Sequence, residues 1–282
     1  MRILCCDDDF ATWRGQARAL LHAGVEPDQV SWEDQQAPQL FTGDDIEVGV
    51  SLPTPSKAVR VPPDLLKDLE TAGHFRMPGR WNLLYRVLWR VAHGERQARL
   101  AGDADGSELQ RRIKAVRREA HHLHAFLRFH PCPQNPDLAY IAWHEPAHDV
   151  LAWASEHFIG RLGQQSWMIV SPRDAVWFDG QTLHYRRTSP PEWQALAKAV
   201  GSEDDALWQT YYASIFNPAR LNLQVMRGHM PSRFWAGVPE GKLIAPLVGS
   251  ARRGARQVGQ ATALTALSGK RIRQATQASE AE

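Results

Sequence analysis

The chain has 282 residues with a formal net charge of +2; its 43% hydrophobic content, including 11 tryptophans, suffices for one large core or two modest ones. Its three cysteines (Cys5, Cys6 and Cys132) are too few for a disulfide framework, a four-cysteine zinc site or a cysteine-ligated iron–sulfur cluster built by this chain alone. No segment approaches the roughly 20 apolar residues of a membrane span, and no signal peptide is present, so we expect a cytoplasmic protein without a membrane partner.

The N-terminal segment predicts a strand over residues 2–6 and an amphipathic helix from Phe10, with three carboxylates, Asp7, Asp8 and Asp9, between them. These carboxylates could hold a divalent metal ion or a catalytic water. They could equally cap the helix and favour its positive end. Asp7 is therefore one candidate catalytic residue.

Residues 25–106 predict strand-like runs at 30–32 and 46–50 within irregular structure, then helices over 63–72 and 81–93 and a loop over 101–106. The helix over 81–93 has an aromatic and aliphatic stripe that includes Trp81 and Tyr85. A stripe at that spacing is typical of core packing rather than of a base-stacking platform.

The sequence predicts a long helix that begins at Ser107, which forms an S-x-x-Q capping pattern with Gln110. Its predicted buried face is Leu109, Ile113, Val116, Ala120 and Leu123. The opposite face carries Arg111, Lys114, Arg118, His121 and His122. Residues 107–128 contain six arginines and lysines against two glutamates. A solvated helix usually interleaves charges to gain ion pairs, so this excess favours an anionic partner such as a phosphate backbone.

The next segment predicts a hairpin, with strands over 126–130 and 138–143, and places Arg128 on the first strand as a phosphate contact. The sequence His144-Glu-Pro-Ala-His148 matches the letters of a zinc-protease motif. Pro146 forbids the continuous helix that such a motif needs, so we expect a helix that starts near Glu145. This helix would place Asp149 near its positive end and carry Arg161.

Two further strand runs are predicted over 167–170 and 176–185, the second with a turn at Asp179-Gly180, and the loop between them contains Arg173. The order strand, strand, helix, strand, strand predicts an α+β fold, with helices packed on an antiparallel sheet. We expect a single domain over residues 1–245, whose C-terminal part is helical, and a flexible basic tail over 246–282.

The C-terminal part predicts a helix over 203–216, followed by Arg220, Arg227 and Arg233 among aromatics that include Tyr212. Basic residues interleaved with aromatics suit binding of a single-stranded or extruded base, although packing of the aromatics with solvated arginines remains open. Residues 1–70 hold 13 acidic and 6 basic side chains, whereas 210–282 hold 3 and 10. We therefore expect the middle and C-terminal parts of the chain to bind DNA.

Residues 116–129, 139–162, 166–180, 211–221 and 230–235 resemble the bacterial domain of unknown function 4130, over roughly residues 1–245. The resemblance implies a role in DNA repair or DNA metabolism. Members of that family are fused to a uracil-DNA-glycosylase-like domain or encoded beside a radical-SAM protein. This chain stops where such fusions would continue, so we expect it to act alone or with one of these as a separate partner.

The function that we favour is a DNA glycosylase, which extrudes a modified or damaged base and hydrolyses its N-glycosidic bond. Such an enzyme needs phosphate contacts, a stacking aromatic, a carboxylate and a proton-transfer group. The candidates are Glu145, Asp149 or Glu119 as carboxylate, His121 or His148 for proton transfer, Trp167 or Tyr212 for stacking, and Arg118, Arg128, Arg161 and Arg173 for phosphates. We expect no cofactor and no metal site.

Two alternatives stay open, and both keep DNA as the partner. One is a non-catalytic adaptor that delivers DNA to a separate glycosylase-like or radical-SAM protein. The other is a metal-dependent nuclease or hydrolase that uses Asp7, Asp9 and the histidines.

Overall fold

The computed structural model describes residues 2–6, 9–32, 60–200 and 204–252. The chain forms two compact units, Met1–Ser202 and Glu203–Glu282, and each is considered by itself. Asp7, the strand-like run 46–50 and most of the expected basic tail lie outside the described residues.

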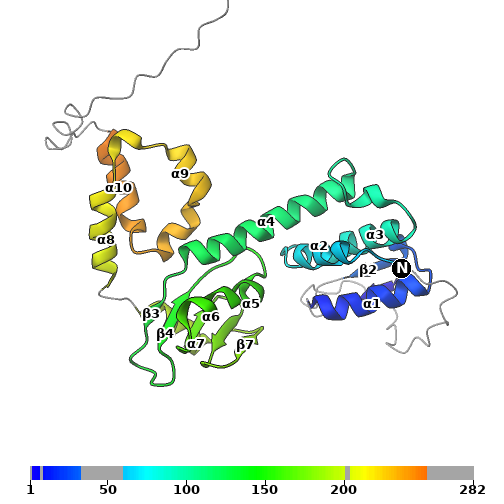
Figure 1. The fold of residues 1–282 in the computed structure, drawn as a ribbon, viewed down its shortest axis with the longest axis horizontal. Coiled ribbons are helices and arrows are strands. Elements are labelled where there is room, and N and C mark those ends of the chain that lie inside the picture. Colours follow the sequence, from blue (N-terminus) through cyan, green and yellow to red (C-terminus); the bar gives the residue numbers. More distant parts are fainter. Residues whose placement is uncertain (1, 7–8, 33–59, 201–203, 253–282) are drawn as a thin grey trace, which may run out of the picture. The chain divides into compact units, whose positions relative to one another are not determined.

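The first unit contains two sheets and their covering helices (Figure 1). Its strands are β1 (Arg2–Leu4), β2 (Val30–Trp32), β3 (His130–Pro131), β4 (Tyr140–Trp143), β5 (Trp167–Val170), β6 (Ala175–Phe178) and β7 (Leu183–Arg186). Its helices are α1 (Phe10–His22), α2 (Pro63–Gly73), α3 (Arg80–Ala92), α4 (Ala104–Phe126), α5 (Leu151–Ala154), α6 (Glu156–Leu162) and α7 (Pro191–Ala199), with short 3-10 turns at Pro27–Gln29 and Arg96–Arg99.

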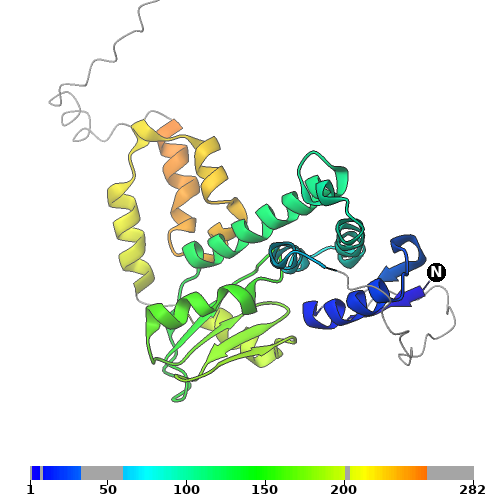
Figure 2. The ribbon, with the colours of Figure 1, turned by 45° about the vertical axis from the view of Figure 1, so that its right-hand side comes forward.

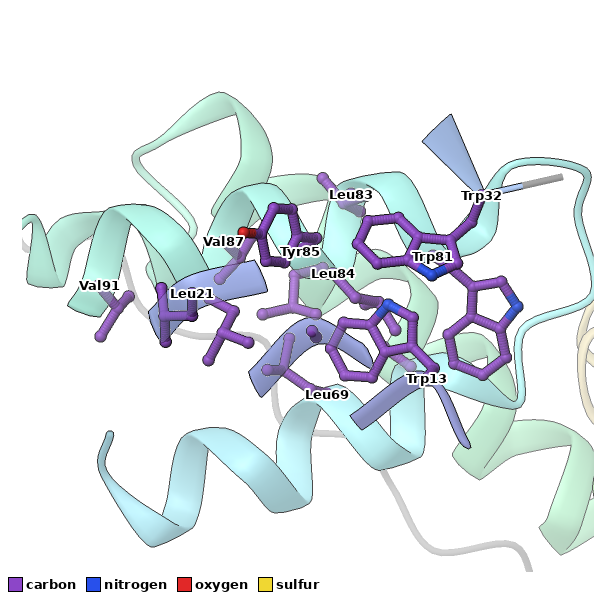
Figure 3. Close-up of a cluster of buried hydrophobic side chains, with 14 of the residues drawn as sticks. Trp13, Leu21, Trp32, Leu69, Trp81, Leu83, Leu84, Tyr85, Val87 and Val91 are labelled. Atoms are coloured by element: carbon purple, nitrogen blue, oxygen red, sulfur yellow. The ribbon is translucent and has the colours of Figure 1, made fainter. Parts of the chain in front are cut away.

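The N-terminal part is built on an aromatic core (Figure 3). Trp13 of α1 stacks on Trp81 of α3 at 5.6 Å between ring centroids, and Trp32 of β2 meets Tyr85 at 5.0 Å. The prediction that the stripe on α3 is core is therefore confirmed. Asp9 caps α1, because its carboxylate accepts from Thr12 N at 2.7 Å and from Thr12 Oγ1 at 2.8 Å.

Helix α4 joins two cores of the first unit (Figures 1 and 2). The predicted apolar face is buried: Leu109 and Ile113 belong to the N-terminal core, whereas Val116, Ala120 and Leu123 belong to the core against the five-stranded sheet. The predicted start at Ser107 is wrong. The helix begins at Ala104, because the Asp103 carboxylate accepts from the backbone N–H groups of Asp105 and Gly106 and forms the cap earlier.

The larger sheet has the strand order β3-β4-β5-β6-β7, and its neighbours are antiparallel except for the parallel pair β4 and β5. The predicted α+β class is confirmed. Alternate residues of β5 face two cores: Trp167 and Ile169 face the core of α4, α5 and α6, and Met168 and Val170 face the core of α7. Both sheet faces are covered, so β5 is apolar throughout.

The proposed base-stacking role of Trp167 is wrong. Its side chain has 0% exposure and packs between Phe129, Phe158 and Phe178, with centroid distances of 5.8, 6.1 and 5.9 Å. A ring enclosed on all sides by core aromatics has no face for a base, so Trp167 is a core residue.

The second unit is helical, with α8 (Asp204–Ile215), α9 (Leu223–His229) and α10 (Gly241–Arg252), and with 3-10 turns at Pro218–Arg220 and Ser232–Gly237. The expected domain boundary at residue 245 falls inside α10, and the compact units divide between Ser202 and Glu203 instead. No helix within the described ranges is long and apolar enough to cross a membrane.

Candidate functional site

The segment His144–Val150 is a loop, and the helix expected near Glu145 begins only at Leu151. Its backbone groups are bonded to residues far away in the chain: Ala147 N donates to Glu119 Oε1 at 2.8 Å, and Asp149 N donates to His74 O at 2.9 Å. Pro146 has no N–H, and its carbonyl accepts from Arg76 Nη1 at 3.0 Å. These bonds replace those of a helical turn, so His148 lies on a loop and not on the helix that a zinc protease needs.

Asp149 is held by two arginines, Arg76 from the segment between α2 and α3 and Arg80 from the start of α3. Arg76 donates from Nε at 2.9 Å and Nη2 at 2.6 Å to Oδ1, and Arg80 donates from Nη1 at 2.5 Å to Oδ2. The Arg80 side chain is 3% exposed, whereas that of Asp149 is 34% exposed. Burial raises the pKa of Asp149, but the two guanidinium groups outweigh it and hold the pKa below its ordinary 3.8. Asp149 is therefore ionised at neutral pH, and one edge of it reaches solvent.

A second carboxyl, Asp174, lies within electrostatic reach of Asp149 on the turn between β5 and β6. It is 5% exposed, accepts a very short hydrogen bond from Ser171 Oγ, and accepts from Tyr185 Oη at 3.1 Å. Burial raises the pKa of Asp174 above 3.8; the hydrogen bonds of Ser171 and Tyr185 lower it in part, and the charge of Asp149 raises it again. The environments thus move the two carboxyl pKa values in opposite directions, which is the pattern of paired acid and base groups.

One aromatic side chain contacts Asp174, and a second lies with two histidines near the loop that carries Asp149. Tyr185 and Trp153 are each 44% exposed. The Trp153 ring lies nearly parallel to His74, with 5.7 Å between centroids and 11° between planes. His148 packs on Phe75 at 4.3 Å, and its Nδ1 accepts from Arg76 N at 3.4 Å, which requires the tautomer with the proton on Nε2.

A basic surface runs from α4 to α6, and we call it the α4–α6 basic face. On α4 the exposed Arg117 and His121 precede His124, whose ring stacks on His157 of α6 at 4.2 Å. Burial lowers the pKa of His157, and the neighbouring His124 and Arg161 lower it further. The face comprises Lys114, Arg117, Arg118, His121, His124, His157 and Arg161.

The family model for the domain of unknown function DUF4130 matches residues 78–240, which is more than half of the chain. The chain belongs to the DUF4130 family. No curated protein and no solved structure matches it. The DUF4130 match includes the basic face, Asp149, Trp153 and Asp174, and begins just after Arg76. It is narrower than the expected 1–245, so the N-terminal acidic turn lies outside it.

The predicted carboxylate and proton-transfer residues have separate places in this DUF4130 chain. Glu119 is buried and fixes the loop through Ala147 N. Glu145 is exposed and accepts from Trp143 Nε1 at 2.9 Å. His121 is exposed on α4, away from the side that carries the buried Glu119. Of the predicted set, Asp149 and His148 lie together at the carboxyl site.

The predicted phosphate-binding arginines also lie in different parts of the structure. Arg118 and Arg161 lie on the α4–α6 basic face, and Arg173 is exposed beside Asp174. Arg128 follows the end of α4 and lies before β3 rather than on a strand, and its Nη1 donates to the carbonyls of Ala125 and Leu127 at 3.0 and 3.1 Å. His122, predicted on the basic face, is buried, with its Nδ1 3.8 Å from Glu119.

The C-terminal candidates of the DUF4130 chain all lie in the second unit. Arg220, Arg227 and Arg233 are exposed there, and Arg233 lies over the buried Phe234 ring at 4.5 Å. Tyr212 is only partly exposed, and burial together with Glu240 raises its pKa. These residues stay candidates for DNA contact.

Six residues at or beside the carboxyl site were not among the sequence-based candidates: His74, Arg76, Arg80, Trp153, Asp174 and Tyr185. A partial signal existed, because the segment 74–80 carries two arginines, a proline and a glycine between two predicted helices. Loops at element ends often carry functional side chains.

The metal-dependent alternative finds no site in the described part of the chain. No group of three or more histidine, cysteine, aspartate or glutamate side chains could hold a metal ion among residues 2–6, 9–32, 60–200 and 204–252. Asp9 serves as the cap of α1 and lies 3.4 Å from Arg187. Asp7 lies outside the described residues.

Proposed function

We propose that this DUF4130 protein binds DNA and holds the phosphate backbone on the α4–α6 basic face. The observation that carries the proposal is a contrast between two groups of basic side chains in the first unit. Arg86, Arg90, Arg99 and Arg111 each pair with a carboxylate at 2.6–2.9 Å. Within the described residues, no carboxylate lies within 4.0 Å of Lys114, Arg117, Arg118 or Arg161.

Exposed cations without internal partners suit phosphate groups, because each phosphate contact releases bound counterions. Affinity for duplex DNA, measured by fluorescence anisotropy across a salt series, is therefore expected to fall linearly on a log–log plot. The slope should be about −0.9 for each phosphate neutralised. No binding at 50 mM salt, or an affinity independent of salt, would reject the proposal.

A second candidate function, hydrolysis of an N-glycosidic bond, is favoured by the carboxyl pair Asp149 and Asp174. In such a reaction the C1′–N bond breaks and its electron pair leaves with the base, while a water oxygen bonds to C1′. The ionised edge of Asp149 can stabilise the positive charge that develops on the sugar. Asp174, which is bonded to the Tyr185 hydroxyl and whose pKa is raised, can supply the proton that the leaving base needs and recover one from the water.

Release of a free base tests this second function. The purified protein is incubated with duplex and single-stranded DNA that carry a panel of modified bases, and released bases are measured by mass spectrometry. We expect release that falls about 10²- to 10⁴-fold in Asp174→Asn, because that variant cannot transfer a proton, with DNA affinity retained. DNA binding without release from any substrate would instead indicate an adaptor for a separate glycosylase-like or radical-SAM protein.

A further inference from the structure

We infer that Trp153 is the platform on which a nucleobase of bound DNA stacks, beside the carboxyl site. This inference rests on the proposed DNA binding, and it names the part of the DNA that would bind at the site, a nucleobase. Among the tryptophans whose side chains the structure describes, Trp153 is the only exposed one, at 44%. An exposed indole offers a flat apolar face, and every nucleobase has a flat face that can stack on it.

The Trp153 ring is held ready for stacking. His74 lies nearly parallel to it, 5.7 Å away, and supports one side of the indole. The backbone of His74 is bonded to the Asp149 loop, since its carbonyl accepts from Asp149 N at 2.9 Å. Burial lowers the pKa of His74 despite the nearby charge of Asp149, so the supporting ring is neutral at neutral pH. A supported, rigid ring loses little conformational freedom when a base stacks on it.

Helix α5 places Trp153 between the two features that the proposed function uses. On one side, Trp153 stacks on His74, whose carbonyl accepts from Asp149 N, so the ring lies near the loop that carries Asp149. The next residue, Ala154, accepts from His124 Nε2 at 2.8 Å through its carbonyl, and His124 belongs to the α4–α6 basic face. A strand whose phosphates lie on that face therefore passes within reach of Trp153, and a base stacked there lies next to Asp149.

The experiment compares two single-stranded oligonucleotides of equal length and charge: oligothymidine, and the same backbone with an abasic site in place of every base. Affinity is measured by fluorescence anisotropy for the wild type, Trp153→Ala and Trp153→Phe. For oligothymidine we expect Trp153→Ala to weaken binding about 5- to 100-fold, the range found when one stacking aromatic is removed. Trp153→Phe should retain most of the affinity, and the abasic strand should bind all three proteins equally.

The outcomes separate this inference from the proposed function. A wild type that binds neither these oligonucleotides nor duplex DNA rejects the DNA-binding proposal itself, and one that binds duplex DNA alone overturns the stacking inference. Equal affinities of wild type and Trp153→Ala for oligothymidine would overturn the stacking inference alone. A loss in Trp153→Ala that is equal for both oligonucleotides would also overturn it, because such a loss does not depend on a base. Thermal unfolding of each variant verifies that the fold is intact.

Discussion

Replacing Asp149 by asparagine is expected to lower the free energy of unfolding by about 2–4 kcal/mol. The substitution leaves Arg80, whose side chain is 3% exposed, without the carboxylate that compensates its charge, and Arg76 loses the same partner. Breaking a fully buried pair costs somewhat more, but 34% of the Asp149 side chain is exposed and water screens that part. Urea unfolding monitored by circular dichroism measures the loss as a lower midpoint at constant slope.

Glu145→Gln is the matched control for this variant. It removes a carboxylate from the same loop, but Glu145 is exposed and its bond from Trp143 Nε1 survives with the amide oxygen as acceptor. Its effect should stay within about 0.5 kcal/mol. Equal midpoints for Asp149→Asn and Glu145→Gln would show that the two arginines do not depend on Asp149.

The pH dependence of the Asp149→Asn effect follows from the direction of the pKa shift. The folded-state pKa of Asp149 is lowered below 3.8, so its stabilisation is fully present above that pH and is lost as the pH falls through the folded-state pKa. The difference in the free energy of unfolding between wild type and Asp149→Asn should thus be largest near neutral pH and should disappear in acid. Asp174 has the opposite effect on stability. Because its folded-state pKa is raised, its contribution to the free energy of unfolding is lost as the pH rises through that pKa.

The regular elements were predictable because they depend on local periodicity. The spacing of Leu109, Ile113, Val116, Ala120 and Leu123 predicts one helical face, and all five are buried. The cap of α4 was misplaced by four residues, since Asp103 and Ser107 both have side chains that can cap a helix. Which of the two caps depends on the bonds that the Asp103 carboxylate forms with Asp105 N and Gly106 N.

The carboxyl site was largely unpredictable because its bonds connect distant parts of the chain. Asp149 pairs with arginines 73 and 69 residues away, and Glu119 holds Ala147 across 28 residues. Local patterns therefore suggest a helix for the segment 145–150, although tertiary bonds hold it as a loop. The two tryptophans show the same limit: Trp167, the predicted stacking residue, is buried, whereas Trp153, which was not selected, is 44% exposed, and only the packing distinguishes them.

The double variant Arg117→Glu/Arg118→Glu is expected to weaken duplex DNA binding about 60-fold or more in 0.1 M salt, since each phosphate contact contributes about eightfold there through counterion release. The magnitude of the salt slope should fall by about 2, one for each contact. Both side chains are exposed on α4, so the fold should be unaffected. Affinity across a salt series measures both effects.

Arg14→Glu/Arg18→Glu is the matched control for the double variant. It makes the same change of net charge at two exposed arginines of one helix, α1, which lies outside the DUF4130 match. Its affinity should remain within a few-fold of the wild type. An equal loss in both double variants would mean that overall charge, and not the α4–α6 basic face, determines binding.

The most direct test of DNA binding on the basic face is a map of where DNA touches the protein. Ultraviolet cross-linking of the wild type to oligothymidine, followed by mass spectrometry of the peptides, provides it. If DNA binds the α4–α6 basic face and stacks on Trp153, we expect cross-links in α4 between Lys114 and His124 and in the segment from Leu151 to Arg161. Cross-links confined to other segments, or none under conditions of saturated binding, would contradict it.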